Sequence, residues 1–410
     1  MNMIERKFSC KSFIIFDKLN NKTLLKIDNR FPQHFYPNSI IDYANIIKEV
    51  VSGKTKNYPI VSLTVKDYPF CDFRCQDCLV KESREWAKKN IDNLVLDIDK
   101  YKKILKDIST YSKENGVENV RIEFCGEGNP DLYVHRKEII QYASQKCNMK
   151  IIYVSTGSGL TDNDLKEIVL NASFIRISFP GVDHMTYNLF SNQKHVKYTY
   201  EDSLNTLRKI VSLRKQYNRE CDLLIGVRAC IRPEFSKLYE NFIYELDEIG
   251  IDCVQLAKVF KYNDNNPTKI NTKLKNVLKK ISNSKYKHLK QVQVPNRYNS
   301  SSDDRKLKNN IFNICFSALF NPVLYGDHLI VCTQTDKIID KQFHYGKLNG
   351  EINEVSQLYN NEVFNKIRKQ LPLCCNDCCS VYDNVLLNKI YDILYENKDN
   401  IDNIKFIMEE

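Results

Sequence analysis

Three cysteines stand close together in the stretch CDFRCQDC, and they are Cys71, Cys75 and Cys78. Their spacings of four and three residues do not aim the side chains of a regular helix or strand at one point, so we expect an irregular loop. Thiolates are soft ligands that suit iron-sulfur clusters or zinc. Structural zinc sites normally have four protein ligands, so three cysteines indicate a site with one open position, where another molecule binds and reacts.

A second group of cysteines lies toward the carboxyl end of the chain, which has fifteen cysteines in all. This group consists of Cys315, Cys332, Cys374, Cys375, Cys378 and Cys379. The amino-terminal residues are polar where a secretory signal would be apolar. We therefore expect a cytoplasmic protein whose clustered cysteines are reduced and bind metal.

Six apolar, β-branched runs alternate with helical patterns and form the elements that must position the first three cysteines. The runs cover residues 61–65, 120–124, 151–155, 174–179, 224–230 and 253–260, and the helical patterns cover 97–115, 135–146, 162–171, 200–217 and 235–249. We expect Thr161 and Asp164 to cap one helix start, and Gly116 and Gly250 to end two helices. The alternation predicts a parallel sheet, open or curled into a partial barrel. Ligands gather at the carboxyl ends of such strands, and the three cysteines directly follow the first run.

The C-x3-C-x2-C spacing after the first strand resembles the radical S-adenosylmethionine (radical SAM) enzymes, and the resemblance covers about residues 60–260. It implies an α/β fold, a partial (β/α)6 barrel of parallel strands, with a 4Fe-4S cluster on the three cysteines. S-adenosylmethionine would bind the open iron through its amino and carboxyl groups. The family usually has an aromatic residue before the third cysteine, whereas this chain has Asp77. Phe73 or Phe70 would then pack against the adenine.

Glycines follow the second strand run in the stretch Gly126-Glu127-Gly128-Asn129-Pro130. Glycine lets the backbone approach a ligand closely, and free N–H groups can be offered to it. The position resembles the family's Gly-Gly-Glu-Pro-like motif, whose backbone receives the methionine amino group. The resemblance assigns this role to Gly126, Gly128 and Asn129, with Glu127 as the acid if one is needed.

Polar residues at later strand ends are further candidates for holding SAM, where the family binds the ribose and the carboxylate. They are Ser155 on the third strand, Ser178 on the fourth and Arg228 on the fifth. A guanidinium in an apolar strand is costly to bury unpaired, so Arg228 needs a carboxylate, either of SAM or of a structural ion pair. Ser178 could equally be a packing residue.

Three single cysteines lie near strand ends that face the expected cavity: Cys125, Cys230 and Cys253. A thiol at such a position could return a hydrogen atom to a substrate radical, and Cys230 and Cys253 are the catalytic candidates. The alternative is that these residues are small buried hydrophobic side chains.

The stretch from Cys315 through Gly326 to Cys332 reads as two strands with a turn, and Cys375 with Cys378 forms a C-x2-C clamp. This arrangement resembles the SPASM and twitch extensions of radical SAM enzymes, which bind auxiliary iron-sulfur clusters. It implies one auxiliary 4Fe-4S cluster, and a structural zinc is the alternative. The expected ligands are Cys315, Cys332, Cys375 and Cys378, with Cys374 and Cys379 as alternates.

The length of 410 residues suggests two or three domains at roughly 100–200 residues each. We divide the chain into an amino-terminal hairpin and helix (1–60), a radical SAM core (61–262), a basic bridge (263–309), an auxiliary-cluster domain (310–385) and a helical tail (386–410).

Net positive charge is concentrated in residues 269–308, where twelve basic and two acidic residues account for the whole net charge of +10. Apolar residues recur there at helical spacing, so we expect an amphipathic helix with a lysine-rich outer face. That face is either simply solvated or docks an acidic electron donor such as a flavodoxin or ferredoxin. No apolar run is long enough to span a membrane. We expect neither a membrane nor a nucleic acid as a partner.

Enzymes with this kind of extension act mainly on ribosomally made peptides or on sugars and cyclitols. The amino-terminal extension and the basic face offer surface for a longer ligand, so we expect oxidative modification or cross-linking of a ribosomal peptide. Radical dehydrogenation or epimerisation of a small sugar or cyclitol is one alternative. A non-catalytic protein that binds iron-sulfur clusters or zinc is the other.

Overall fold

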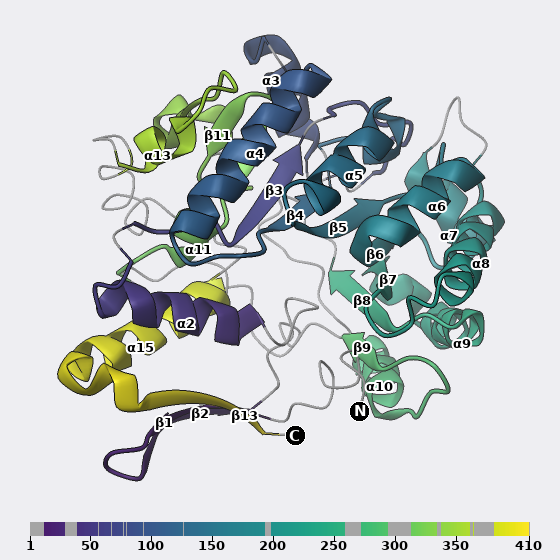
Figure 1. Ribbon diagram of the computed structural model, residues 1–410. Helices are drawn as coiled ribbons and strands as arrows, with labels where there is room; N and C mark the ends of the chain where they lie inside the picture. Colours follow the sequence, from purple (N-terminus) through teal and green to yellow (C-terminus); the bar gives the residue numbers. More distant parts are fainter. Residues whose placement is uncertain are drawn as a thin grey trace.

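A computed structural model gives the structure of the chain (Figure 1). It describes residues 12–28, 39–55, 57–66, 68–76, 78, 80–92, 94–125, 127–192, 198–258, 272–293, 313–333, 338–360, 364 and 381–409. Several residues singled out above lie outside these ranges, and they are Asp77, Gly126, Cys374, Cys375, Cys378 and Cys379.

The centre of the molecule is a sheet of ten strands, six of which are the parallel strands expected from the apolar runs. In spatial order these six are β3 (Ser62–Lys66), β4 (Arg121–Phe124), β5 (Lys150–Ser155), β6 (Ala172–Phe179), β7 (Leu224–Ile231) and β8 (Cys253–Lys258). The expected fold, a mixed α/β chain around a mostly parallel sheet, is confirmed.

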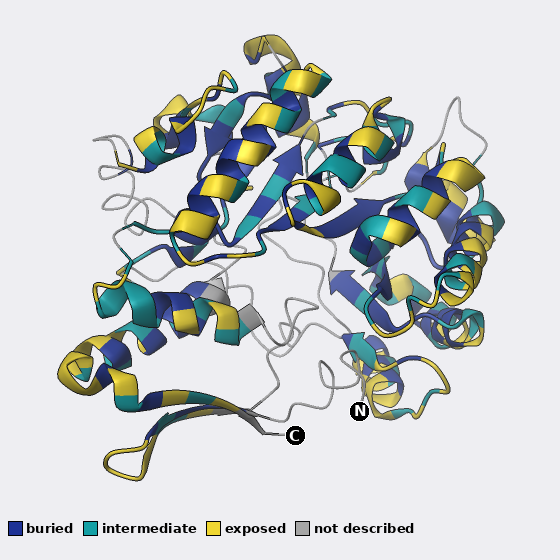
Figure 2. Cartoon of the chain, viewed as in Figure 1, coloured by how far each residue is buried: buried dark blue, intermediate teal, exposed yellow. Residues whose placement is uncertain are grey.

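Helices connect the parallel strands and cover the outer face of the sheet. They are α3 (Lys81–Asn90), α4 (Ile98–Glu114), α5 (Arg136–Gln145), α6 (Asp162–Asn171), α7 (His184–Ser191), α8 (Tyr200–Gln216) and α9 (Tyr239–Ile249), with short 3-10 helices η1 (Pro130–Leu132) and η2 (Pro233–Leu238). Helices α4, α5 and α6 lie side by side across the sheet (Figure 1). Each turns a buried stripe to the strands and an exposed stripe to solvent (Figure 2).

The expected helix ends are present where the local sequence encodes them. Thr161 and Asp164 form a reciprocal capping box at the start of α6. Gly250 ends α9 in the left-handed conformation, and Gly116 follows α4 with a positive φ.

The inner face of the sheet has an apolar cluster of its own, separate from the main core between the strands and the helices. Its members come from four adjacent strands and are Ile152, Val154, Phe174, Leu224 and Cys253, with Cys125 packed against them. Gly226 leaves room for this packing, because a Cβ atom there would lie 2.9 Å from the ring of Phe174 and 3.0 Å from the sulfur of Cys253.

Further strands extend the sheet at both edges. Beyond β8 lies β9 (Gln291–Gln293), preceded by α10 (Thr272–Asn283), the expected amphipathic helix. Beyond β3 lie β10 (Val323–Tyr325), β11 (His328–Ile330) and β12 (His344–Lys347), with α11 (Phe316–Phe320), η4 (Lys341–Phe343) and α13 (Glu354–Tyr359) around them. The two strands and turn expected between the cysteines are therefore present, and β10 pairs in parallel with β3.

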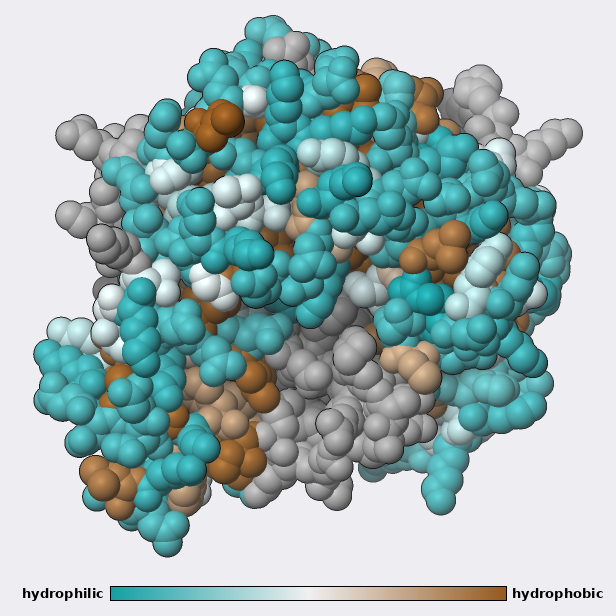
Figure 3. Space-filling model, in the orientation of Figure 1, coloured by the Kyte–Doolittle hydropathy of each residue, from teal (hydrophilic) through white to brown (hydrophobic). Residues whose placement is uncertain are grey.

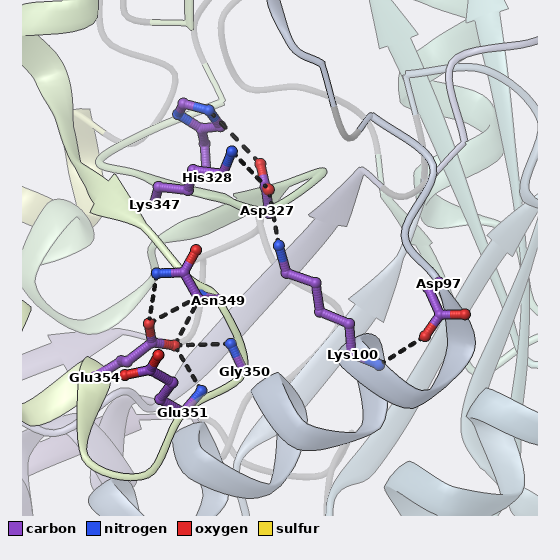
Figure 4. A network of polar contacts seen from close by, with 9 residues as sticks. All are labelled: Asp97, Lys100, Asp327, His328, Lys347, Asn349, Gly350, Glu351 and Glu354. Carbon is purple, nitrogen blue, oxygen red and sulfur yellow. Dashed lines mark hydrogen bonds and ion pairs between the residues drawn. The ribbon is translucent and has the colours of Figure 1, made fainter.

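Polar contacts attach this carboxyl-terminal part to α4 (Figure 4). Asp327, in the turn between β10 and β11, is fully buried and pairs with Lys100 at 2.9 Å and with Lys347 at 3.4 Å. In the next turn the Glu354 carboxylate accepts hydrogen bonds from three consecutive backbone N–H groups, those of residues 349–351. The Asp327 carboxylate thus joins its turn to α4, and the Glu354 carboxylate holds the turn at residues 349–351.

The two ends of the chain meet in a second sheet, in the order β13-β1-β2. Its strands are β1 (Ser12–Asp17), β2 (Lys22–Asp28) and β13 (Ile404–Glu409), and α2 (Ser39–Val51) packs against α15 (Val381–Glu396) beside it. The amino-terminal hairpin and helix are as expected. The prediction of a helical tail over 386–410 is wrong in its last part. After α15 the chain passes through η5 (Lys398–Asn403), and β13 then pairs with β1 as a strand.

Hydrophilic residues cover most of the molecular face drawn in Figure 3, as expected for helices whose apolar stripes face a sheet. Among the described residues, no helix combines the length and the apolar character that crossing a bilayer requires.

Candidate functional site

The loop between β3 and α3 carries Cys71, Cys75 and Cys78, all of them partly buried. The end of α7 anchors this loop, because the N–H groups of Arg74 and Gln76 donate to the last two backbone carbonyls of that helix at 3.0 and 3.1 Å. Because β3 ends at Lys66 and α3 begins at Lys81, the loop lies at the carboxyl end of β3, as the sequence predicts.

The three thiols are close enough to influence one another. Burial raises the pKa of Cys75 to about 12, and the neighbouring thiols of Cys71, Cys78 and Cys230 add to this shift. Burial also raises the pKa of Cys71 to about 11. Among the described residues, no three His, Cys, Asp or Glu side chains are arranged so that they could hold a metal ion.

The two aromatic candidates for packing against adenine differ in their surroundings. Phe73 is buried against the rings of Tyr187 and Tyr198, with centroids 6.3 and 6.4 Å away. Phe70 is 48% exposed and packs on Tyr68. Phe73 thus anchors the loop, and Phe70 is the ring that a ligand can reach.

The segment after β4 lies directly against the cysteine loop. The Gly128 N–H donates to the Tyr68 carbonyl at 3.0 Å, and the Asn129 N–H donates to the Phe70 carbonyl at 2.7 Å. A Cβ atom on Gly128 would lie 1.9 Å from the Phe70 carbonyl oxygen, so only glycine allows this approach. The expectation that these N–H groups are offered to a ligand is wrong, because the loop backbone occupies both of them.

A buried polar network joins Asn129 to the cysteine loop. Its side-chain amide donates to Asp72 at 3.1 Å and to the Ser158 hydroxyl at 2.8 Å. The Ser158 hydroxyl in turn donates to Asp72. Asn129 and Ser158 are almost completely buried. Asp72, inside the cysteine motif, is therefore fixed from two neighbouring strand ends.

Ser155, expected to hold SAM, is bound within the protein. Its hydroxyl donates to Asp131 at 2.8 Å and accepts from the Gly157 N–H at 2.7 Å, and the residue is 3% exposed. Asp131 also accepts from the Tyr153 hydroxyl at 2.9 Å. Burial raises the pKa of Asp131 to about 7, although these hydrogen bonds oppose the shift. Ser155 therefore holds Asp131, whose backbone N–H donates to the Asn129 side-chain oxygen at 3.3 Å.

Glu127, the alternative acid of the glycine-rich stretch, is committed to a buried ion pair. It binds the Lys66 ammonium and accepts from the Ser83 hydroxyl at 2.8 Å. Burial alone would lower the pKa of Lys66, but the Glu127 carboxylate and other nearby acidic groups raise it. This pair joins β3, β4 and α3 beneath the cysteine loop.

Ser178 and Arg228 come together on the inner face of the sheet, where they are register partners on β6 and β7. Both are partly buried. Cys230 lies two residues beyond Arg228, on the same face and near Cys75. Cys253 and Cys125 instead belong to the apolar cluster deeper inside, where Cys253 is fully buried.

The described cysteines of the carboxyl-terminal group, Cys315 and Cys332, both lie near Tyr345 of β12. Burial raises the pKa of Tyr345 well above its ordinary value, and the thiols of Cys315 and Cys332 add to this effect. The Asn384 amide of α15 donates to the Cys315 sulfur at 3.7 Å. The two thiols are therefore near the same tyrosine, whereas their expected partners at positions 374–379 lie outside the described residues.

The basic helix α10 lies beside β9, at one edge of the large sheet. It packs against α9 and η2, beside β9 at the edge of the sheet opposite β10–β12, and Lys280 pairs with Glu240 of α9. Docking of an acidic electron donor on α10 stays a prediction.

Sequence reasoning missed Asp72, Ser158, Asp131 and Lys66 as parts of the site. Each lies at the end of a strand or in the segment that follows it, but no spacing rule pairs residues from separate segments. These contacts depend on strand order, which only the folded chain specifies.

No protein-family profile and no curated protein sequence matches the chain. Solved structures do resemble it. SuiB from Streptococcus suis has a TM-score of 0.55 at 11% sequence identity, with 86% of this chain and 80% of SuiB covered. SuiB bound to the precursor peptide SuiA has a TM-score of 0.54 at 13% identity, with 92% and 82% covered.

A further resemblance is to native anSMEcpe with bound AdoMet and the Cp18Cys peptide. The TM-score is 0.51 at 15% identity, and the alignment covers 84% of this chain and 100% of that one. At such low identity the likeness concerns the fold, and the chain shares the overall fold of SuiB and anSMEcpe.

Proposed function

We propose that the protein is a radical SAM enzyme that modifies a peptide. Cys71, Cys75 and Cys78 would hold a 4Fe-4S cluster whose open iron binds S-adenosylmethionine. When bound, such a cluster supplies the electron that cleaves SAM, and the resulting 5'-deoxyadenosyl radical removes a hydrogen atom from the substrate. The protein would position SAM and substrate and exclude water.

The observation that carries this proposal is the three-cysteine loop at the carboxyl end of β3, held against the Gly128 segment. Three thiols on one partly buried loop suit an iron-sulfur cluster with an open position. The amino group of SAM needs hydrogen-bond acceptors, which the backbone carbonyls of the Gly128 segment can provide. The remaining SAM contacts are assigned to Gly126, Ser178 and Arg228. Asn129 and Ser155, whose side chains bind within the protein, would hold the backbone around SAM in place.

A peptide is the proposed substrate because proteins with the same fold have been solved with peptides. SuiB has structures with S-adenosylmethionine and with precursor peptide SuiA, and anSMEcpe has structures with AdoMet and a peptide. Oxidative modification or cross-linking of the peptide is the proposed outcome. Cys230, on the inner face near Cys75, is the better placed of the two candidate hydrogen-atom donors.

An auxiliary 4Fe-4S cluster is part of the proposal. The shared proximity of Cys315 and Cys332 to Tyr345 supports it, and the other ligands would be Cys375 and Cys378, with Cys374 and Cys379 as alternates. A flavodoxin or ferredoxin would supply the first electron.

Formation of 5'-deoxyadenosine from SAM under dithionite tests the proposal, after anaerobic reconstitution of the full chain with iron and sulfide. We expect wild type to form it, and Cys71→Ala, Cys75→Ala and Cys78→Ala each to lose at least a hundredfold. Cys221→Ala is the matched control, because this exposed cysteine lies outside the site. Equal SAM cleavage in all variants, or zinc in place of iron with no cleavage, would refute the proposal.

A further inference from the structure

The inner face of the sheet carries a polar layer next to its apolar cluster. Across the adjacent strands β6, β7, β8 and β9, the register places in one row Ser178, Arg228, Gln255 and Gln293. Gln255 lies two residues beyond Cys253 of the apolar cluster, so both side chains point to the same face. The row therefore faces the interior, on the side nearer the cysteine loop.

The side-chain oxygens of two glutamines in this row are buried without hydrogen-bond partners among the described residues. In the part of the chain that the structure describes, the side-chain oxygens of Gln255 and Gln293 have no partner, and Gln293 is only 6% exposed. The two residues occupy paired positions on neighbouring strands, about 5 Å apart. Buried amides without partners destabilise a protein and are rare, so this pair indicates a ligand that supplies the missing hydrogen bonds.

A cation on the same face is also incompletely paired. Arg176 of β6 stands in register between Val154 and Gly226, and within the described chain its buried Nε has no hydrogen-bond partner. Its Nη2 lies 3.9 Å from the Glu123 carboxylate, which is longer than a hydrogen bond. The interior thus offers a hydrogen-bond donor as well as the two amide acceptors.

We infer that this inner layer binds a peptide segment of the substrate, with an apolar side chain resting on the Phe174 cluster and backbone N–H groups donating to Gln255 and Gln293. The inference rests on the proposed function and names the residues that recognise the substrate. A peptide also offers a carbonyl to Arg176. A sugar or cyclitol carries hydroxyl groups on all sides, and those turned toward the apolar cluster would be left without partners.

Thermal stability tests the inference without any ligand. Gln255→Leu and Gln293→Leu keep the side-chain volume and remove a buried amide, so each should raise Tm by about 2 to 4 °C. Gln145→Leu on α5 is the control for the same chemical change at an exposed position, and its Tm should not rise. A fall in Tm of either inner variant would mean that the amide already has a partner within the fold, and it would overturn the inference.

Binding is the second arm, and the probe is a displayed library of random twelve-residue peptides selected on the reconstituted full chain. The best peptide should contain an apolar residue, and its Kd should rise at least tenfold in both inner variants but stay unchanged in Gln145→Leu. Unchanged Kd values in both inner variants would overturn the inference. So would a selection that enriches no peptide, whether or not a cyclitol such as myo-inositol binds. Neither the stability experiment nor the binding experiment measures SAM cleavage. A failed SAM-cleavage assay would therefore refute the proposed reaction without changing the Tm or Kd values measured here.

Discussion

Replacing Gly128 by alanine should separate the cysteine loop from the segment after β4. The added Cβ would lie 1.9 Å from the Phe70 carbonyl oxygen, whereas such contacts essentially never fall below 3.0 Å. The two backbones must therefore move apart by about 1.1 Å, which lengthens the hydrogen bonds to the Tyr68 and Phe70 carbonyls to about 4.1 and 3.8 Å and breaks both. Two broken bonds between partly buried backbone groups cost about 2 to 6 kcal/mol.

Urea unfolding followed by circular dichroism measures this loss, and iron content after anaerobic reconstitution reports on the loop. We expect Gly128→Ala to lower both the urea midpoint and the iron bound per chain. Gly226→Ala is the comparison, because its Cβ would meet side-chain atoms of Phe174 and Cys253 that can shift, at a cost of about 1 to 3 kcal/mol. Wild-type stability and iron content in Gly128→Ala would refute the close-approach argument.

Three further predictions concern elements around the site. Asp252→Asn should cost about 3 kcal/mol or more, because it leaves the buried Arg214 guanidinium without its anionic partner, and an unchanged urea midpoint would contradict this. Thr161→Ala should cost about 1 kcal/mol by removing the capping box of α6, whereas Thr161→Ser should cost less; equal losses would exclude the cap as the cause. Burial holds the pKa values of His328 and His344 below the ordinary 6.5, so the unfolded chain takes up protons first and stability falls as the pH drops through about 6.5. The double variant His328→Gln, His344→Gln should lose less stability than wild type between about pH 7.5 and 5.5, and equal loss would refute this reasoning.

Local patterns were sufficient to predict the elements that position the site. The apolar runs, the capping box at Thr161 and the left-handed glycine at Gly250 depend on neighbouring residues alone, and the structure has them where the sequence predicts. The strand at Ile404–Glu409 was misread as helix, because its pairing with β1 joins the two ends of the chain. Local periodicity carries no information on such a contact.

Within the site, the sequence predicted the cysteine loop and singled out Ser178 and Arg228 separately, and the structure shows that these two are register partners. It did not predict that Gly128 is needed to pack one backbone on another, or that Asn129 would be fixed by Asp72. These features arise where loops from different strands meet, and they follow from strand order and register rather than from residue spacing.

We propose that the three-cysteine loop holds a cluster whose open position binds SAM. Electron paramagnetic resonance of the dithionite-reduced protein tests it most directly, in the double variant Cys315→Ala, Cys332→Ala, which removes the proposed auxiliary ligands. We expect a 4Fe-4S signal whose g values change when SAM is added, and the signal should disappear when Cys75→Ala is introduced as well. A signal that is insensitive to SAM, or one that survives Cys75→Ala, would show that the three cysteines do not hold a SAM-binding cluster.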